Sequence, residues 1–529
     1  MKVALIASPY PLSESPAPPL GLCCAAAAFE AAGCEVRILD YIVSQYTPTK
    51  LQAEVERFSP DIVGTNSVTL NFHRAAEILQ TVKEMDDSII TVMGGPHVSF
   101  DFHRTLQRYP GIDLIVVGEG EETIRELVSV AADRDAWPRV RGIAFAANGA
   151  VRYTGKREFI ADLDALPLPA RHLLPLSRYQ AMGFPISLIT SRGCPNQCLF
   201  CQGCRMVGSR VRNRSPEKVV DEIEAILAYG FQRINFADDF FTVNKKRVGR
   251  ICSEIRRRGL LFGWSAFARA DSVDRDLLCT LKEAGCDALL FGIESGNQEM
   301  LDRVGKRIRL KRIQEAVADA RAAGMNIFGS FIAGLPGETL DTLRETHAFA
   351  MNLGIPFGYH FLAPFPGTPI LDDIDQYDLQ LLTDDWSRFD ANHPVTRTAA
   401  LSAADVEQFV YDNYLKEIEA EEVCIAQRFQ ENRCSAAEWM QCMGKQKNEI
   451  VFQIFSNDLI ERHGSVPDGH RGTDPAKLLI ENLQPFLAND PAIVATVMRE
   501  IIEKGFLTCR PTASGSQWQW AENSVTVRP

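Results

Sequence analysis

The chain has 529 residues, enough for three or four domains with large cores, and its formal net charge is −12 at pH 7. This acidic balance argues against a nucleic acid as the main partner, because phosphate binding requires a basic surface. The 14 Cys are scattered, and Pro9 interrupts the opening run Met1–Ala7 too soon for a secretory leader. No apolar run has membrane-spanning length either, so we expect a cytoplasmic protein in a reducing compartment, without a membrane segment.

Residues 1–150 alternate short apolar runs with amphipathic stretches. The expected strands are Val3–Ala7, Val36–Leu39, Asp61–Gly64, Ile89–Met93 and Leu114–Gly118. Helical patterns such as Leu22–Ala32 and Ala75–Met85 lie between them. Continuous apolar strands separated by helices predict an α/β domain with a Rossmann-like, doubly wound parallel sheet.

Small or turn-forming residues follow several of these strands, at the edge where such sheets bind ligands. They lie in Pro18–Gly21, Gly64–Ser67, Gly94–His97 and Gly118–Glu121. Glycine and serine at these positions let a bulky ligand approach the backbone. The candidate binding residues are Gly64, Asn66, Ser67, Gly94, Gly95, Gly118, Glu119 and Gly120.

Residues 151–185 contain several Pro and are expected to form an extended connector to a second domain at 186–400. Six strand–helix units are predicted there. Their strands are Ile186–Arg192, Arg233–Asp239, Phe262–Arg269, Ala288–Glu294, Asn326–Ala333 and Phe357–Pro364. The helices between them include Pro216–Tyr229, Lys245–Arg258 and Leu310–Ala323. A second doubly wound sheet would share this pattern.

Three cysteines, Cys194, Cys198 and Cys201, directly follow the strand expected at Ile186–Arg192. Thiolates at spacings of four and three can converge on an iron–sulfur cluster, and three ligands leave one iron of a 4Fe–4S cluster open. A zinc site usually pairs two Cys-x-x-Cys knuckles, and no partner knuckle follows. Cys204 also permits a closed, four-Cys electron-transfer cluster. The motif favours a partial (β/α)6 barrel, whose sites lie at the carboxyl ends of the strands.

Charged residues end three of these strands. Asp238 and Asp239 alternate in direction, so we expect one to point into the barrel and the other to cap the next helix. Arg269 can pair with a ligand carboxylate or form an interdomain salt bridge. The alternative role of Glu294 is that of a helix N-cap. The basic run Arg205–Arg214 is most simply a solvated loop, and docking of an electron donor is the alternative.

Residues 401–529 are predicted to form a mostly helical C-terminal domain. Two amphipathic patterns within Asp474–Phe506 precede a hairpin signal, in which Ser514–Ser516 separates Phe506–Arg510 from Gln517–Ala521. Helices followed by a hairpin resemble a winged-helix module, which we expect to contact protein or substrate in this acidic chain.

Taken together, the motifs resemble those of the cobalamin-dependent radical S-adenosylmethionine (SAM) family. The run Pro18-Pro-Leu-Gly, Asp61-Ile-Val-Gly, Gly94-Gly-Pro-His and Gly118-Glu-Gly-Glu is similar to the family's N-terminal cobalamin-binding domain. The Cys194–Cys201 spacing resembles the family's cluster motif. The resemblance implies a 4Fe–4S cluster whose open iron binds SAM and whose electron splits SAM to a 5′-deoxyadenosyl radical.

The resemblance extends to the ends of the later barrel strands. It implies that Gly292–Gly296 faces SAM, that exposed backbone groups of Ala333–Glu338 recognise adenine, and that Leu362–Pro369 borders the substrate. The residues implied in SAM binding are Asp239, Arg269, Glu294, Ser295, Gly334 and Pro336.

The first loop of the cobalamin-like domain departs from many cobalamin proteins. Ser8–Ser15 lacks the Asp-x-His-x-x-Gly pattern whose histidine ligates cobalt, and His73 and His103 are expected at the surface. The resemblance therefore implies cobalamin bound without a protein histidine beneath the cobalt.

The family's commonest reaction is methylation of an unactivated carbon, in which one SAM methylates cobalt(I) and a second SAM supplies the radical. The resemblance implies a small-molecule or peptide substrate and a flavodoxin- or ferredoxin-type electron donor. One alternative is ring formation, as in the anaerobic magnesium-protoporphyrin monomethyl ester cyclase. Another is a radical SAM dehydratase with a vestigial cobalamin domain. An electron carrier is disfavoured by the SAM motifs.

The remaining cysteines do not indicate a second cluster. Cys23, Cys24 and Cys34 do not resemble the second cluster site of methylthiotransferases, and this disfavours that reaction. Cys424, Cys434 and Cys442 are widely spaced, and we expect them to be buried structural thiols.

Overall fold

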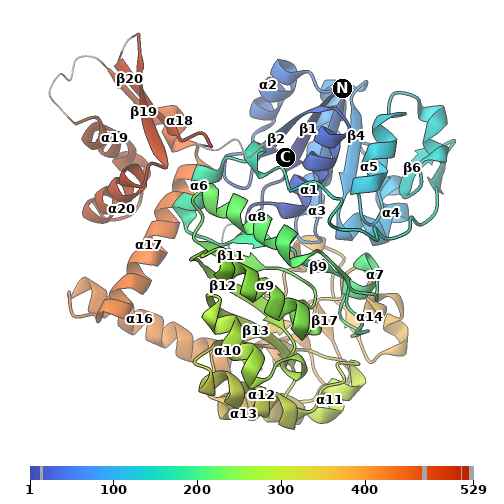
Figure 1. The fold of residues 1–529 in the computed structure, drawn as a ribbon, viewed down its shortest axis with the longest axis vertical. Coiled ribbons are helices and arrows are strands. Elements are labelled where there is room, and N and C mark those ends of the chain that lie inside the picture. Colours follow the sequence, from blue (N-terminus) through green and yellow to red (C-terminus); the bar gives the residue numbers. More distant parts are fainter. Residues whose placement is uncertain (12–15, 468–473, 514, 524–529) are drawn as a thin grey trace.

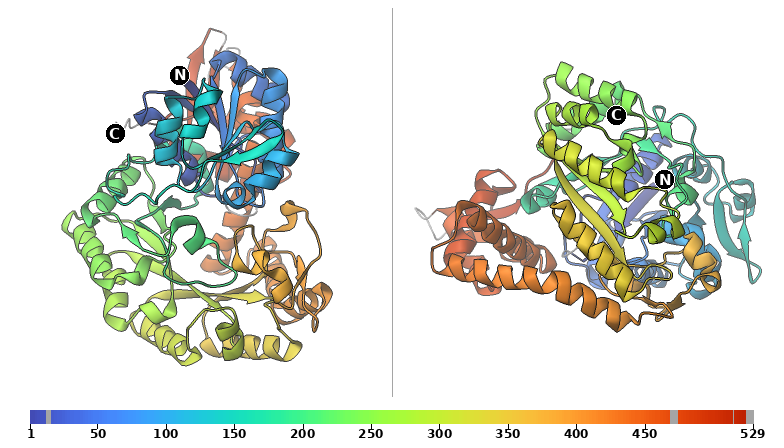
Figure 2. Two further views of the ribbon diagram at one scale, coloured as in Figure 1. Left: turned by 90° about the vertical axis from the view of Figure 1, so that its right-hand side faces the viewer. Right: turned by 90° about the horizontal axis from the view of Figure 1, so that it is seen from below.

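The computed structural model describes residues 1–11, 16–467, 474–513 and 515–523. Figure 1 shows an N-terminal domain above a curved sheet that is flanked by helices, with a long helical arm leading to a C-terminal module. The α/β class predicted from the sequence, with its helical C-terminal part, is confirmed. Figure 2 shows that the N-terminal domain lies over one end of the curved sheet.

The N-terminal sheet has seven strands in the order β2-β1-β3-β4-β5-β6-β7. The parallel strands are β1 (Lys2–Ala7), β2 (Glu35–Asp40), β3 (Ile62–Asn66), β4 (Ile90–Gly94) and β5 (Leu114–Val116), which follow the predicted strands closely. The antiparallel hairpin β6 (Ile143–Ala147) and β7 (Ala150–Tyr153) extends one edge of the sheet. The sequence analysis misses it, although Asn148-Gly149 between the two strands is a typical hairpin turn.

Helices cover both faces of this sheet. They are α1 (Leu20–Ala31), α2 (Pro48–Phe58), α3 (Phe72–Met85), α4 (Pro96–Arg108) and α5 (Glu121–Val128). Helices α1 and α5 pack on one face, and α2, α3 and α4 pack on the other. Trp386 and Phe389, which follow the second sheet in the chain, complete the core beneath α3. The two α/β domains therefore share part of a hydrophobic core.

The second sheet is the predicted partial barrel. Its six parallel strands have the order β15-β14-β13-β12-β11-β8. They are β8 (Ile186–Leu188), β11 (Arg233–Phe236), β12 (Gly263–Ala268), β13 (Cys286–Glu294), β14 (Asn326–Ala333) and β15 (Phe357–Phe361). The helices on its outer face are α8 (Pro216–Ala228), α9 (Lys245–Arg257), α10 (Arg275–Glu283), α12 (Leu310–Ala322) and α13 (Leu340–Leu353).

The first barrel strand is shorter than predicted. The chain leaves the sheet after Leu188, and β9 (Ser191–Arg192) pairs antiparallel with β10 (Arg212–Asn213). This small ribbon brackets the cysteine loop and the helix α7 (Gly203–Val207). The cysteines are thereby held beyond the carboxyl end of the barrel strand, where barrel sites lie.

The C-terminal part begins with α15 (Ala403–Val410) and an arm of two helices, α16 (Lys416–Gln430) and α17 (Ala436–Ser456). Beyond the arm, a three-stranded antiparallel sheet has the order β18-β20-β19. The C-terminal module that contains this sheet consists of α18 (Leu459–His463), β18 (Ser465–Pro467), α19 (Pro475–Leu483), α20 (Pro491–Glu503), β19 (Leu507–Thr512) and β20 (Gly515–Trp520). The predicted hairpin is observed as β19 and β20; Ser514 of its turn lies outside the described residues.

The expectation of buried thiols in this part is wrong. Cys424 is exposed, and Cys434 and Cys442 are partly exposed. The reason is that the arm packs on little else: α16 buries a single side chain, Ile425, and α17 buries side chains only in its second half, from Ile450 onward. Of the helices in the described ranges, not one combines the length and the apolar character needed to cross a membrane.

Candidate functional site

The three predicted cluster ligands lie in one loop after β9, and backbone hydrogen bonds hold this loop from three sides. The Cys194 amide donates to the Gly208 carbonyl at 3.1 Å, and the Leu199 amide donates to the Val304 carbonyl at 3.0 Å. The Leu199 carbonyl accepts from the Ile370 amide at 3.1 Å. These three bonds involve only the backbone, so the thiols remain available as ligands.

The thiols of this loop suit a 4Fe–4S cluster. Asn196 Nδ2 donates to Cys194 Sγ at 3.4 Å, and the Gly203 amide donates to Cys201 Sγ at 3.3 Å, as donors to cluster thiolates do. Among the described residues, no three Cys, His, Asp or Glu side chains converge as one metal ion requires. A cluster makes no such demand, because each thiolate binds a different iron atom.

The two adjacent aspartates after β11 have different roles. Asp238 is buried and accepts from the Thr190 amide and hydroxyl, each at 2.6 Å, so it holds the turn between β8 and β9. Asp239 faces the cluster loop, where its Oδ2 accepts from the Gly193 amide at 3.4 Å. The expectation that one of them caps the next helix is wrong, because Asn244 caps α9.

Glu294 ends β13 with a buried carboxylate and a left-handed backbone at φ 70°. Its Oε1 accepts from Lys306 Nζ at 2.6 Å. A non-glycine residue in this conformation costs about 1–3 kcal/mol and persists where surrounding contacts enforce it, as they do at binding sites. The alternative that Glu294 caps a helix is wrong, because Asn297 caps α11 (Gln298–Arg303).

Lys306 is the residue of this site that the sequence analysis misses. Its buried ammonium lies 6.0 Å from the centre of the Phe200 ring in the cluster loop, and the preceding Gly305 carbonyl lies 3.9 Å from Cys198 Sγ. Burial raises the pKa of Cys198, and the charge of Lys306 opposes this. Lys306 lies in a loop, where no hydrophobic periodicity could have indicated its position. The local sequence signal is the preceding Gly305, which adopts φ 69° in a tight turn.

Two further predicted SAM-binding residues have partners of their own. Arg269 pairs with Asp271, with Nη2 to Oδ2 at 2.8 Å, and donates to the Lys306 carbonyl at 2.8 Å. The alternative prediction, that Arg269 forms an interdomain salt bridge, is therefore wrong, because Asp271 belongs to the same domain. Ser295 is fully buried, and its hydroxyl lies 3.0 Å from Thr346 Oγ1.

In the loop after β14, two backbone amides donate hydrogen bonds to the side chain of Glu338, which lies in the same loop. Oε2 of the fully buried Glu338 accepts from the amides of Gly334 at 2.6 Å and Leu335 at 3.2 Å. The expectation of exposed backbone groups is wrong for these two amides, which are buried and occupied. Pro336 is also buried, and recognition of adenine by this loop stays a prediction.

Burial raises the pKa of Glu338 from 4.5 to about 8, against the two amide hydrogen bonds that lower it. The folded protein therefore keeps this proton at pH values where the unfolded chain has lost it, and stability falls as the pH rises from about 4.3 towards 8. We expect Glu338→Gln to remove this slope, which is at most about 1.4 kcal/mol per pH unit. The measurement is the melting temperature of both proteins from pH 5 to 9, with the exposed Glu299→Gln as control. Parallel profiles for wild type and Glu338→Gln would contradict the assignment.

The predicted cobalamin-binding residues gather at the carboxyl edge of the N-terminal sheet. The Ser67 amide donates to the Gly94 carbonyl at 3.0 Å, and a Cβ on Gly95 would lie 2.4 Å from the Ser67 carbonyl oxygen. The Gly118 amide donates to Ser99 Oγ at 3.0 Å. Asn66 and Gly120 lie at the same edge. Small residues and backbone dominate this edge, which suits a broad, flat cofactor such as a corrin ring.

Some of these predicted residues serve packing instead. Gly64 lies inside β3, where a Cβ would meet the Leu5 side chain at 2.8 Å. His97 is buried with its ring centre 4.1 Å from that of Phe72, and burial lowers its pKa to about 3. His103 is exposed, as expected. The absence of a histidine beneath cobalt stays a prediction.

The β9–β10 ribbon, which brackets the cluster loop, is in direct contact with this edge of the N-terminal sheet. Arg192, the last residue before the loop begins, donates to the Glu119 carboxylate at 3.0 Å. Leu362–Pro369 packs between the two domains, and a Cβ on Gly367 would lie 2.2 Å from the Phe100 ring. The two predicted cofactor sites therefore face the same end of the barrel.

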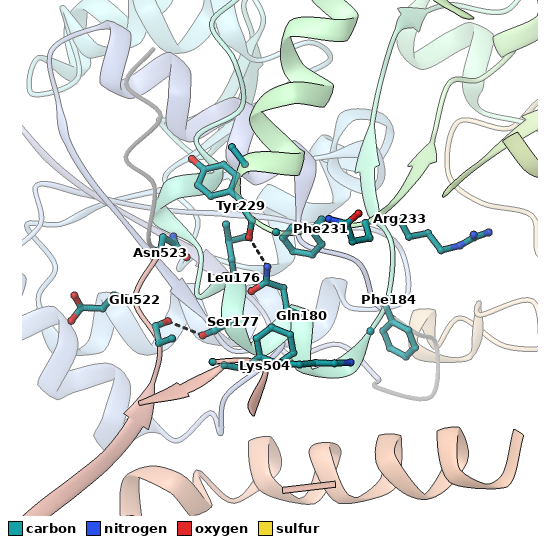
Figure 3. Close-up of a pocket in the computed structure, with 17 residues that line it drawn as sticks. Leu176, Ser177, Gln180, Phe184, Tyr229, Phe231, Arg233, Lys504, Glu522 and Asn523 are labelled. Carbon is teal, nitrogen blue, oxygen red and sulfur yellow. Dashed lines mark hydrogen bonds between the residues drawn. The ribbon is translucent and has the colours of Figure 1, made fainter. Parts of the chain in front are cut away.

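A hollow of about 600 Å³ lies elsewhere, between the barrel and the C-terminal module. Figure 3 shows Gln180, Tyr229, Lys504 and Asn523 around it. Its wall includes Arg233, the first residue of β11, so it opens at the opposite end of that strand from Asp239 and the cysteines. We do not include it in the candidate site.

Comparisons with known proteins agree with this geometry. The B12 binding domain model matches residues 13–128, and the Radical SAM superfamily model matches residues 188–350. The chain is 34% identical over 401 residues to the uncharacterized methyltransferase PH0819 of Pyrococcus horikoshii, covering 75% of this chain and 87% of that protein. It is 30% identical over 392 residues to the anaerobic magnesium-protoporphyrin IX monomethyl ester cyclase of Cereibacter sphaeroides, covering 72% of this chain and 63% of that relative's length.

Among solved structures, the cobalamin-dependent SAM radical enzyme OxsB, with aqua-cobalamin and SAM bound, matches with a TM-score of 0.68. The match covers 95% of this chain and 79% of that chain at 19% identity, and it shows a shared fold. Fold, cysteine loop and matched domains define a radical SAM enzyme with a B12-binding domain. The chain belongs to the cobalamin-dependent radical SAM family, and its cofactors are a 4Fe–4S cluster, SAM and cobalamin.

Proposed function

We propose that the protein methylates an unactivated carbon atom of a small-molecule or peptide substrate. The observation that carries the proposal is the direct contact between the ribbon that brackets the cluster loop and the carboxyl edge of the N-terminal sheet, through Arg192 and Glu119. When bound, the cluster and SAM supply a 5′-deoxyadenosyl radical, and cobalamin supplies a methyl group. The 34% identical relative that is named a methyltransferase supports the same reaction.

In this proposal the chain's own residues bind and orient. The thiolates of Cys194, Cys198 and Cys201 would hold the cluster. Glu294 would accept hydrogen bonds from the ribose hydroxyls or the ammonium of SAM, and Lys306 donates to its carboxylate at 2.6 Å. Bringing both cofactors and the substrate carbon within contact distance is then a matter of positioning.

The inner face of the barrel offers apolar surroundings for such a carbon. Leu289, Phe291 and Ile293 of β13 belong to the core beneath the helices, so the alternating Leu290 lies on the inner face. The register places Phe267 and Phe328 beside Leu290, and they are 45% and 37% exposed. These two rings can pack against an apolar part of the substrate.

We further propose a flavodoxin- or ferredoxin-type electron donor and a cytoplasmic location. All 14 Cys are free thiols, which suits a reducing compartment. The basic run after the cluster is not the simple solvated loop expected from the sequence, because Arg214 pairs with the buried Glu222 and Arg212 with Glu119. Arg210, which is exposed beside Gly193, remains the basic residue best placed to meet an acidic donor.

Two products of SAM distinguish the proposed reaction from its rivals. The reconstituted protein is incubated without oxygen with methyl-labelled SAM, a chemical reductant such as dithionite, and a metabolite extract of the cells that make the protein. We expect S-adenosylhomocysteine and 5′-deoxyadenosine to increase in comparable amounts, with label in a new product. An increase in 5′-deoxyadenosine alone, without transferred label, would exclude methyl transfer and favour a cyclase-like or dehydratase reaction.

A further inference from the structure

The Gly118–Glu121 motif contacts the β9–β10 ribbon, which brackets the cluster loop, with both of its carboxylates. Arg212 donates to Glu119 through Nη1 and Nη2, each at 2.9 Å, and Arg192 donates to Glu119 at 3.0 Å. Arg192 also donates to Glu121. The glutamates come from the N-terminal domain and the arginines from the barrel domain, so the network crosses the domain boundary.

This network is buried and balanced in charge. The side chains of Glu119, Arg212, Glu121 and Arg192 are 6%, 9%, 10% and 16% exposed. Two carboxylates face two guanidinium groups, and the Ile160 amide adds a donor to Glu119 at 2.9 Å. Buried ion pairs with this many charge-assisted hydrogen bonds are strongly directional, and removal of one partner leaves another charge unpaired.

The position of the network in the chain connects the two cofactor sites by short backbone paths. Arg192 ends β9 and stands two residues before Cys194, and Arg212 lies directly opposite Arg192 in the β9–β10 ribbon. Glu119 follows the carboxyl end of β5, the edge at which sheets of this kind bind their ligands. A shift of the network would therefore move the first cluster ligand relative to the cobalamin edge.

We propose that Glu119, Glu121, Arg192 and Arg212 form an interdomain clamp that sets the distance and orientation between the iron–sulfur cluster and cobalamin. They are positioning residues, which act through the cluster loop and the end of β5. The shared core around Trp386 and Phe389 joins the two domains on another side, and this network fixes them beside the cluster loop, where a displacement of about 1 Å can cost about 100-fold in rate. The inference rests on the binding of both cofactors and not on transfer of a methyl group.

The test measures geometry and does not depend on product formation. Glu119→Gln protein is loaded with cluster and cobalamin, and the magnetic interaction between the reduced cluster and cobalt(II) is measured by electron paramagnetic resonance. We expect a changed interaction relative to wild type. The matched control is Glu126→Gln, which loses the surface pair with Arg157 in the same domain and should match wild type. An unchanged interaction in folded, loaded Glu119→Gln protein would overturn the clamp and would assign Glu119 to stability alone.

A second readout uses the protein without cofactors, in case Glu119→Gln loads poorly. Hydrogen exchange of residues 193–201 is expected to rise about tenfold or more in Glu119→Gln, because the anchor of that loop is weakened. Arg212→Lys, which keeps the charge but not the two-pronged geometry, should give an intermediate increase. Exchange equal to that of Glu126→Gln in both variants would overturn the proposal. Failure of methyl transfer, with both readouts as expected, would count against the proposed reaction and leave the clamp standing.

Discussion

Replacing Cys194, Cys198 or Cys201 with Ala is expected to abolish both the cluster and the formation of 5′-deoxyadenosine. Each thiolate binds one iron, and a loop with two ligands does not retain a 4Fe–4S cluster. The backbone hydrogen bonds of Cys194 and Leu199 do not involve the thiols, so the variants should keep the loop and the fold. Iron and sulfide content after anaerobic reconstitution should fall from about four of each per chain to near zero.

The matched control is Cys204→Ala. Cys204 lies on the short helix α7, three residues beyond Cys201, and is partly exposed. Its replacement should leave the cluster absorption and 5′-deoxyadenosine largely intact. Loss of the cluster in Cys204→Ala with retention in Cys194→Ala would show that the ligand assignment is wrong.

Lys306→Met should destabilise the protein strongly, because it leaves the buried Glu294 carboxylate without its partner at 2.6 Å. Breaking a buried pair in this way typically costs about 3–5 kcal/mol. For a domain of this size we expect the melting temperature of the unloaded protein to fall by roughly 6–20 °C.

The double variant Glu294→Gln/Lys306→Met separates charge from packing. It removes both charges, and most of the lost melting temperature should therefore return. Binding of SAM, measured by equilibrium dialysis on the cluster-loaded protein, should stay weak in both variants, because the proposed ligand carboxylate is absent or unsupported. A double variant as unstable as Lys306→Met would show that the pair does not carry the effect.

The alternation of strands and helices was predictable because each element is indicated by the hydrophobic pattern of its own residues. Strands β1 and β3 are buried on both faces and appear in the sequence as continuous apolar runs. Strand β13 alternates between buried and partly exposed residues over part of its length, and this gives a period of two. The β6–β7 hairpin was not predictable in this way, since β7 is largely exposed and lacks an apolar run. The prediction of buried thiols failed at the arm helix α16, because apolar residues there, such as Val423, are exposed although the sequence suggests a buried face.

The site residues that belong to one continuous motif were predictable from the sequence. The contacts between residues from separate segments of the chain were not. The cysteine ligands are consecutive and were identified by spacing. The partner of Glu294 was not identified, because Lys306 lies in an irregular loop. Strand alternation showed that Asp238 and Asp239 differ in direction, but only the contact with Thr190 shows which is structural. The arginine partners of Glu119 were not identified, because they lie 73 and 93 residues away in the chain.

The anchoring of the cluster loop has a consequence for biogenesis. Leu199 depends for its backbone partners on Val304 and Ile370, which the ribosome makes long after Cys201. At about 5–20 residues per second, the interval between Cys201 and Ile370 is on the order of 10–30 s. During that time the nascent thiols lie outside their final loop and are open to oxidation or to adventitious metals. The final geometry of the cluster loop is therefore complete only after the last barrel strand has been translated, so a cluster held in that geometry is expected to be inserted after translation of the barrel.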